Sequence, residues 1–154
     1  MLKTNVMRIL DKAKIGYTPF EYSPELTEGV KIAETLGEDC KSVFKTLVTE
    51  SNTKEHFVFV IPVDKTLDLK AAARAVGTKA VSMLKQKELL PLTGYIHGGC
   101  SPVGMKKKFK TVIDKSAGDL PLFYVSAGRV GYQVRLDPHE LAEFIGADFS
   151  DITV

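Results

Sequence analysis

The chain has 154 residues, of which 44% are apolar and 26% are charged, and its formal net charge is +2. This composition is typical of a folded globular protein, and no stretch approaches the ~18 consecutive apolar residues of a membrane-spanning helix. The charge is too weak to indicate nucleic-acid binding by itself, so any such contact must come from a local basic patch.

The few cysteines and histidines indicate the compartment and argue against a metal site. Cys40 and Cys100 lack metal-type spacing, and the three histidines are scattered. Residues 1–5 lead directly into a helical pattern without the layout of a signal peptide. We therefore expect a cytoplasmic protein with one domain, residues 1–154, and no cofactor or metal.

The first half of the chain alternates helical and strand patterns. Apolar residues recur at helical spacing from Leu2 to Ala13, and Gly16 follows. A turn at Ser51, Asn52 and Thr53 separates two apolar runs that read as a hairpin. The elements expected after the first helix are a strand over Tyr17–Tyr22, a helix over Glu28–Leu36 and strands over Val43–Thr49 and His56–Ile61.

The second half begins and ends with clear helix signals. Asp68 is an N-cap for a helix over Leu69–Val76, which Gly77 ends. Asp137, Pro138 and Glu140 form a helix start before Leu141. Between them we expect a strand over Lys79–Met83, a helix over Lys85–Leu90 broken by Pro91, and strands over Tyr95–His97, Phe109–Ile113, Leu122–Val125 and Tyr132–Leu136.

The late strands follow one another without intervening helices, whereas a doubly wound parallel sheet requires stricter alternation. The predicted fold is therefore mixed α/β (α+β), with a curved, barrel-like mixed sheet surrounded by helices.

Lys45 lies within the apolar strand Val43–Thr49. Positions 43, 45 and 47 share one face of a strand, so the ammonium group needs a partner, a cavity or an exit to water. A solvent-facing lysine on an edge strand is the alternative.

Gly98–Gly104 is a glycine-rich loop whose main chain a ligand could approach closely. Successive free N–H groups in such a turn can bind an anion or oxyanion. It is neither a Walker loop nor a dinucleotide-binding motif, and a purely structural turn is the alternative.

Other residues near the loop can be interpreted either as functional or as purely structural. Cys100 with His97 suggests a nucleophile, although catalytic pairs seldom lie so close in sequence. Lys106, Lys107 and Lys108 could bind phosphates or form a solvated face. Ser126 and Gly128 belong to a small-residue turn that could add a hydroxyl donor or be an ordinary hairpin.

Taken together, the motifs resemble the YbaK/EbsC family, which is related to the editing domain of prolyl-tRNA synthetase. The similarity covers nearly the whole chain, and the lysine strand combined with the glycine-proline loop is its specific part. The matching segments, in order, are Val43–Leu47, Leu67–Lys70, Thr93–Tyr95, Gly98–Gly104, Lys106–Lys107 and Tyr124–Gly128.

The resemblance implies trans-editing, in which a wrong amino acid, typically Cys, is cleared from tRNA for proline or from tRNA for cysteine. It implies an aminoacylated tRNA 3′ end as partner, with prolyl-tRNA synthetase as a second, and no membrane. Lys45 matches the essential lysine. The expected substrate-binding residues are Tyr22, Thr46, Gly98, Gly99, Ser101, Pro102, Ser126, Gly128 and Gln133, with Lys106, Lys107 and Lys108 on tRNA phosphate.

Two departures bear on specificity. Cysteine-editing members tend to carry aspartate where this chain has Gln133, and an aromatic residue where it reads Thr27, Glu28 and Gly29. In such relatives the substrate's own thiol attacks its carbonyl and leaves as a thiolactone; a bound water is the alternative attacker. A deacylase for another small amino acid such as Ala, a Cys100-dependent hydrolase and a non-catalytic module that binds a tRNA end or a synthetase remain open.

Overall fold

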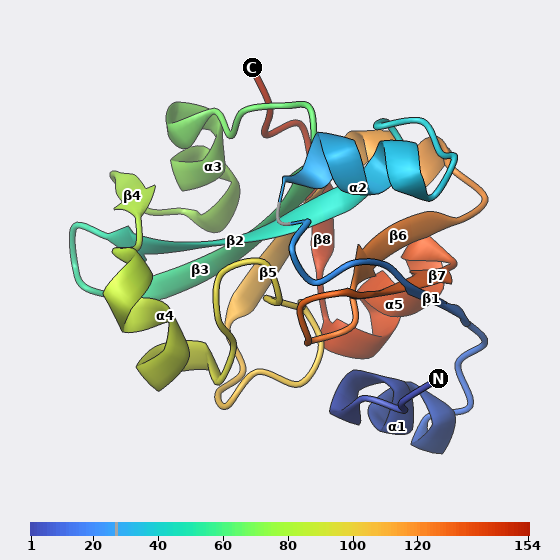
Figure 1. Cartoon of the computed structure of the whole chain (residues 1–154). Coiled ribbons are helices and arrows are strands. Elements are labelled where there is room, and N and C mark those ends of the chain that lie inside the picture. The colour runs from blue at the N-terminus through green and yellow to red at the C-terminus, as the bar shows by residue number, and fades with distance from the viewer. Residues whose placement is uncertain (27) are drawn as a thin grey trace.

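A computed structural model of the chain describes residues 1–26 and 28–154. Its strands form two sheets, which Figure 1 shows at the centre of the molecule. The larger sheet is mixed and has the order β4-β2-β3-β5-β8, and the smaller is antiparallel with the order β1-β7-β6. The strands are β1 (Thr18–Glu21), β2 (Phe44–Ser51), β3 (His56–Pro62), β4 (Val81–Met83), β5 (Lys110–Asp114), β6 (Phe123–Ser126), β7 (Tyr132–Leu136) and β8 (Asp148–Ser150).

Helices cover both faces of the larger sheet. Phe59 and Ile61 of β3 pack on one face against α3, while Phe44 and Val60 pack on the other against α1, α5 and the smaller sheet. Figure 1 accordingly shows α3 on one side of β2 and β3 and α4, α5 and α1 on the other. The helices are α1 (Asn5–Lys12), α2 (Gly29–Thr35), α3 (Leu69–Val76), α4 (Gln86–Thr93), α5 (Pro138–Ile145) and a 3₁₀ turn over Lys115–Asp119. In the described part of the chain, none is long and apolar enough to cross a membrane.

Local signals set the firmest elements. The Asp68 carboxylate accepts hydrogen bonds from the N–H groups of Lys70 and Ala71, and Gly77 ends α3 at φ 74°. Asp137 caps α5 in the same way, and Gly146 ends it at φ 68°. The predicted hairpin of β2 and β3 is present, with Ser51 Oγ accepting from the N–H groups of Thr53 and Glu55 in its turn.

The mixed α/β class with outer helices is confirmed, but the strands do not close into a barrel. β2 pairs along its length with β3 and only partly with β4. Val43, the residue just before β2, makes one isolated bridge to Tyr124 of β6. The two sheets therefore stay separate layers that touch at the start of β2.

Two local predictions were wrong. Pro91 lies inside α4 and does not break it, because only two helical residues follow it before Gly94 caps the helix at φ 87°. The Thr93 hydroxyl also donates to the Leu89 carbonyl, which fixes the last turn. Residues 95–97 form no strand, because their main chain enters a tight turn.

Candidate active site

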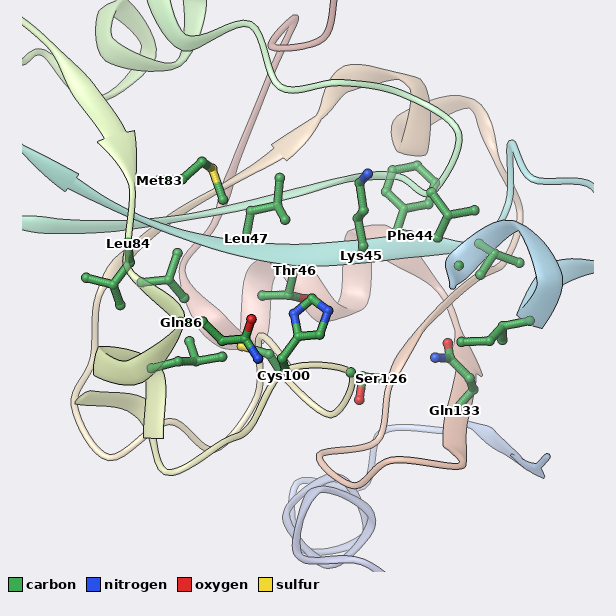
Figure 2. A pocket seen from close by; sticks show the side chains of 18 residues that line it. Phe44, Lys45, Thr46, Leu47, Met83, Leu84, Gln86, Cys100, Ser126 and Gln133 are labelled. Atoms are coloured by element: carbon green, nitrogen blue, oxygen red, sulfur yellow. The ribbon is translucent and has the colours of Figure 1, made fainter. Parts of the chain in front are cut away.

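A cavity of about 310 Å³ lies along the start of β2, and Figure 2 shows it from close by. One wall comes from β2 itself, and others come from β4, α4, the glycine-rich loop and the facing ends of β6 and β7. Lys45, Thr46, Gly98, Ser126 and Gln133 all line it. The structure thus brings together five of the residues expected at the site, from segments that are far apart in the sequence.

The cavity exists because one edge of β2 is left without a partner strand. β4 pairs with β2 only from Thr49 to Ser51, and its pairing ends where Leu84 N–H donates to the Val48 carbonyl. Main-chain groups of alternate residues point to alternate edges of an antiparallel strand. The N–H and C=O of Thr46 therefore point in the same direction as those of Val48, toward the cavity.

Lys45 and Thr46 leave β2 on opposite faces. Figure 2 shows Lys45 extending to the same side of the strand as Leu47, and Thr46 to the side of Gln86, Cys100 and Ser126. Lys45 is half-buried, and in the described residues no carboxylate lies within ion-pair distance of it. No Asp or Glu is among the 18 lining side chains, so no described carboxylate shares the cavity with the ammonium group.

The turn at Gly98 is set by its backbone. The N–H of Gly99 donates to the carbonyl of Ile96 at 3.0 Å, and Gly98 adopts φ 87°. These are the features of a type II turn, whose third position has positive φ and therefore favours glycine. The turn places His97 and Gly98 in the cavity wall.

Two residues that line the cavity carry buried polar atoms without a protein partner. Gln133 is 5% exposed, and its Oε1 has no hydrogen-bond partner among the described residues; the same holds for the buried Oγ1 of Thr46. Ser126 Oγ, in contrast, accepts from the N–H of Gly128. A buried acceptor left unpaired costs about 1–3 kcal/mol, which a hydrogen-bond donor on a ligand would recover.

Cys100 lines the cavity as a neutral thiol. It is 9% exposed, and burial raises its pKa well above the ordinary range, to about 12. Because the thiolate is the nucleophile, this thiol is a poor one at neutral pH. Its neighbour His97 is exposed, and no hydrogen bond joins the two in the described structure. Residues 1–26 and 28–154 also contain no group of three side chains that could hold a metal ion.

Five residues expected to bind substrate lie outside this cavity. Tyr22 is 6% exposed and its hydroxyl is buried without a partner. Gly99 and Gly128 are glycines for packing: a Cβ would lie 3.0 Å from Val130 N at one and 2.8 Å from Val6 Cγ2 at the other. Ser101 is fully buried and caps the N–H of Val103, and Pro102 lines a second cavity.

The basic run also lies away from the cavity. Lys107 and Lys108 line the second cavity, while the Lys106 side chain crosses Gly94, 3.3 Å from where a Cβ would stand. Of the segment that departs from cysteine-editing members, Thr27 lies outside the described residues, Glu28 precedes α2 and Gly29 lines the first cavity.

Sequence reasoning missed one wall of the cavity, which is apolar except for Gln86. Its members come from β4, from α4 and from the residues between them: Met83, Leu84, Gln86 and Leu89. Nothing in their spacing distinguishes them from core residues, since Leu84 and Leu89 also pack in a buried cluster with Val48 and Val58.

Comparison with known proteins gives one consistent result. The model of the aminoacyl-tRNA editing domain family matches residues 24–144. A protein of Enterococcus faecalis, provisionally named the Cys-tRNA(Pro)/Cys-tRNA(Cys) deacylase EbsC, is 42% identical over 153 residues, 98% of this chain and 93% of that protein.

Solved structures agree over the whole length. The crystal structure of the hypothetical protein APE2540 has a TM-score of 0.89 at 25% identity and covers 97% of this chain and 99% of its own. A second crystal structure, described provisionally as a trans-editing enzyme for prolyl-tRNA synthetase, has a TM-score of 0.83 at 22% identity. The match covers 100% of this chain and 99% of that protein. At that identity the second match establishes the fold alone.

Proposed function

The chain belongs to the aminoacyl-tRNA editing domain family, and from that premise we propose that it is a trans-editing deacylase that clears Cys from mischarged tRNA for proline. Cys-tRNA for cysteine is the second substrate we propose, following the name of the Enterococcus relative.

One observation carries the proposal: a single cavity holds a cation without a counter-charge, a glycine turn and buried acceptors without partners. An aminoacyl-adenosine end has the complementary groups. Its phosphate and ribose suit the ammonium of Lys45, and its α-ammonium group suits Gln133 Oε1 and Thr46 Oγ1. Buried polar groups without partners are otherwise costly, so their position in a cavity wall favours a polar ligand.

The chemistry then divides among these residues. The N–H of Gly98 would donate to the oxygen of the tetrahedral intermediate, where removal of one such donor typically costs ~3 kcal/mol. Lys45 would hold the terminal phosphate or ribose, or stabilise developing negative charge. Gly99, Ser101, Pro102 and Gly128 would act by fixing the turns at Gly98 and Ser126, and Tyr22 would act from outside the cavity.

The attacking group would come from the substrate or from water. When the Cys thiol attacks, its sulfur bonds to the carbonyl carbon, the ester C–O bond breaks, and the thiol proton passes to the ribose oxygen. With water, the oxygen bonds instead and the free amino acid leaves. In neither case does the neutral Cys100 thiol act as the attacking group. Holding the thiol beside the carbonyl is worth a large effective molarity.

The test is a panel of Cys, Ala, Ser and Pro esters of tRNA for proline, with Cys-tRNA for cysteine, incubated with purified protein. We expect release of Cys in preference to Pro. Preferential release of Ala would assign the enzyme to another small amino acid. Tight binding without release from any ester would make the chain a binding module for the tRNA end or prolyl-tRNA synthetase, and would refute the deacylase proposal.

A further inference from the structure

A second cavity, of about 280 Å³, lies on the far side of the glycine-rich loop, between that loop, the start of β5 and the helices α1 and α5. We propose that it binds an unpaired nucleotide of the tRNA acceptor end while the acylated terminal nucleotide occupies the first cavity. The inference rests on the proposed function for the identity of the RNA, and adds to it a site for a second nucleotide.

The lining offers the chemistry that a single-stranded nucleotide needs. Phe109 and Phe144 both belong to the wall of the cavity; Phe109 is half-buried and Phe144 is 42% exposed. Lys107 and Lys108 are exposed at the same cavity, and no Asp or Glu lines it. Aromatic faces combined with a positive groove are the common means of binding single strands, because every base has a face that can stack.

The three lysines of the basic run do not act together. Lys106 lies over Gly94, at the end of α4, whereas the side chain of Lys108 reaches toward Gly146 at the end of α5. Only Lys107 and Lys108 contribute to the second cavity. Phosphate contacts of this run would therefore lie beside the aromatic wall and away from Lys45.

The loop itself connects the two cavities. Gly98 and Cys100 line the first, and Pro102, Val103 and Gly104 line the second. The chain from Gly98 to Pro102 spans at most about 14 Å even when fully extended. In Figure 1 this yellow segment runs between α4 on one side and α5 and α1 on the other. A few nucleotides at the end of an acceptor stem can follow the loop from one cavity to the other.

The test measures binding of two non-acylated RNA hairpins with the same stem, one with a four-nucleotide 3′ overhang and one blunt, by fluorescence anisotropy. Phe144→Ala should weaken binding of the overhang hairpin about 5- to 150-fold, the range expected for loss of one base–aromatic stack. Phe144→Tyr should bind as the parent protein does, and the blunt hairpin should not distinguish the three proteins.

A second variant keeps the test decisive if Phe144→Ala fails to fold. Lys107→Ala/Lys108→Ala should reduce the slope of log K against log salt by about 0.7 for each phosphate that a lysine no longer neutralises. The control, Lys70→Ala/Lys79→Ala, removes two exposed lysines that line neither cavity and should leave the slope unchanged.

Equal binding of the overhang hairpin by the parent and Phe144→Ala proteins overturns the proposal, and so does an equal loss with the blunt hairpin. Because the RNA carries no ester, this result does not depend on deacylation. A protein that releases no amino acid but shows the Phe144 dependence would refute the enzyme while supporting the nucleotide site.

Discussion

Replacing Lys45 by methionine tests the role of the cavity's ammonium group most directly. Methionine keeps an unbranched stem of similar length and removes the charge. Lys45 is half-buried and pairs across the sheet with the fully buried Ile61, so the stem can stay in place. No described carboxylate pairs with the ammonium, and the substitution therefore leaves no buried partner without its counter-charge.

The expected effects on stability and on catalysis differ strongly. The free energy of unfolding should change by less than ~1 kcal/mol, because neither a cavity nor an unpaired polar group is created. Loss of an electrostatic interaction made in the transition state typically lowers kcat by about 10²–10³-fold. If Lys45 only binds ground-state phosphate, KM should rise with little change in kcat.

The measurement is single-turnover release of Cys from Cys-tRNA for proline, with urea unfolding of the same preparation. Lys70→Met, at an exposed position on α3, is the matched control and should retain full activity. A Lys45→Met protein that is folded and releases Cys at the parent rate would remove Lys45 from the mechanism. A protein that fails to fold would contradict the stability argument.

Three further outcomes test other parts of the site. Cys100→Ala should retain activity, since burial raises the pKa of this thiol to about 12 and keeps it protonated. The pKa of a cysteine in the unfolded chain is near 8.5, so the stability that this group contributes is present below pH ~8.5 and is lost as pH rises toward 12. In urea unfolding, the variant should therefore lose less stability at alkaline pH than the parent protein. Gln133→Leu should lower kcat/KM by about tenfold or more while the free energy of unfolding is unchanged or higher, because its Oε1 has no described protein partner; unchanged kcat/KM would refute its role. Gly128→Ala should lower the free energy of unfolding by about 1–3 kcal/mol more than Gly37→Ala, as measured in urea. Both glycines have positive φ, but of the two only Gly128 has a neighbour that the new Cβ would meet. Equal losses of stability would contradict the packing role.

The sequence predicts an element well when the cause of that element is local. Asp68 and Asp137, for example, accept hydrogen bonds from N–H groups two and three residues later and so begin α3 and α5. Pro91 was misread because its own preference was weighed without Gly94, where the helix ends in any case. β8 was missed altogether: its three residues pair only with β5, more than thirty positions earlier in the chain. No local pattern encodes such a pairing.

Three glycines near the site also show that a local pattern does not reveal what a residue does. Gly98, Gly99 and Gly128 look alike in the sequence, and each could let a ligand approach the main chain. The structure separates them, because only Gly98 lines the first cavity, whereas Gly99 faces the backbone of Val130 and Gly128 faces α1. Positive φ occurs both at Gly98 and at Gly128, so conformation alone does not distinguish them. What decides is which neighbour occupies the space of the missing side chain.

The open edge of β2 explains how a single strand can present a cation and hydrogen-bond acceptors to one ligand. A fully paired strand would hide its main chain, and Lys45 and Thr46 would face separate compartments on the two faces of the sheet. Because β4 stops at Met83, the cavity reaches around the edge and both residues line it. The ammonium of Lys45 would then attract phosphate on one side, while Thr46 and Gln133 offer oxygen acceptors to the α-ammonium group on the other. Under the proposed function, an aminoacyl-adenosine end would set its phosphate side at Lys45 and its α-ammonium group at Thr46 and Gln133, with its ester between them and the turn at Gly98 in the same cavity wall.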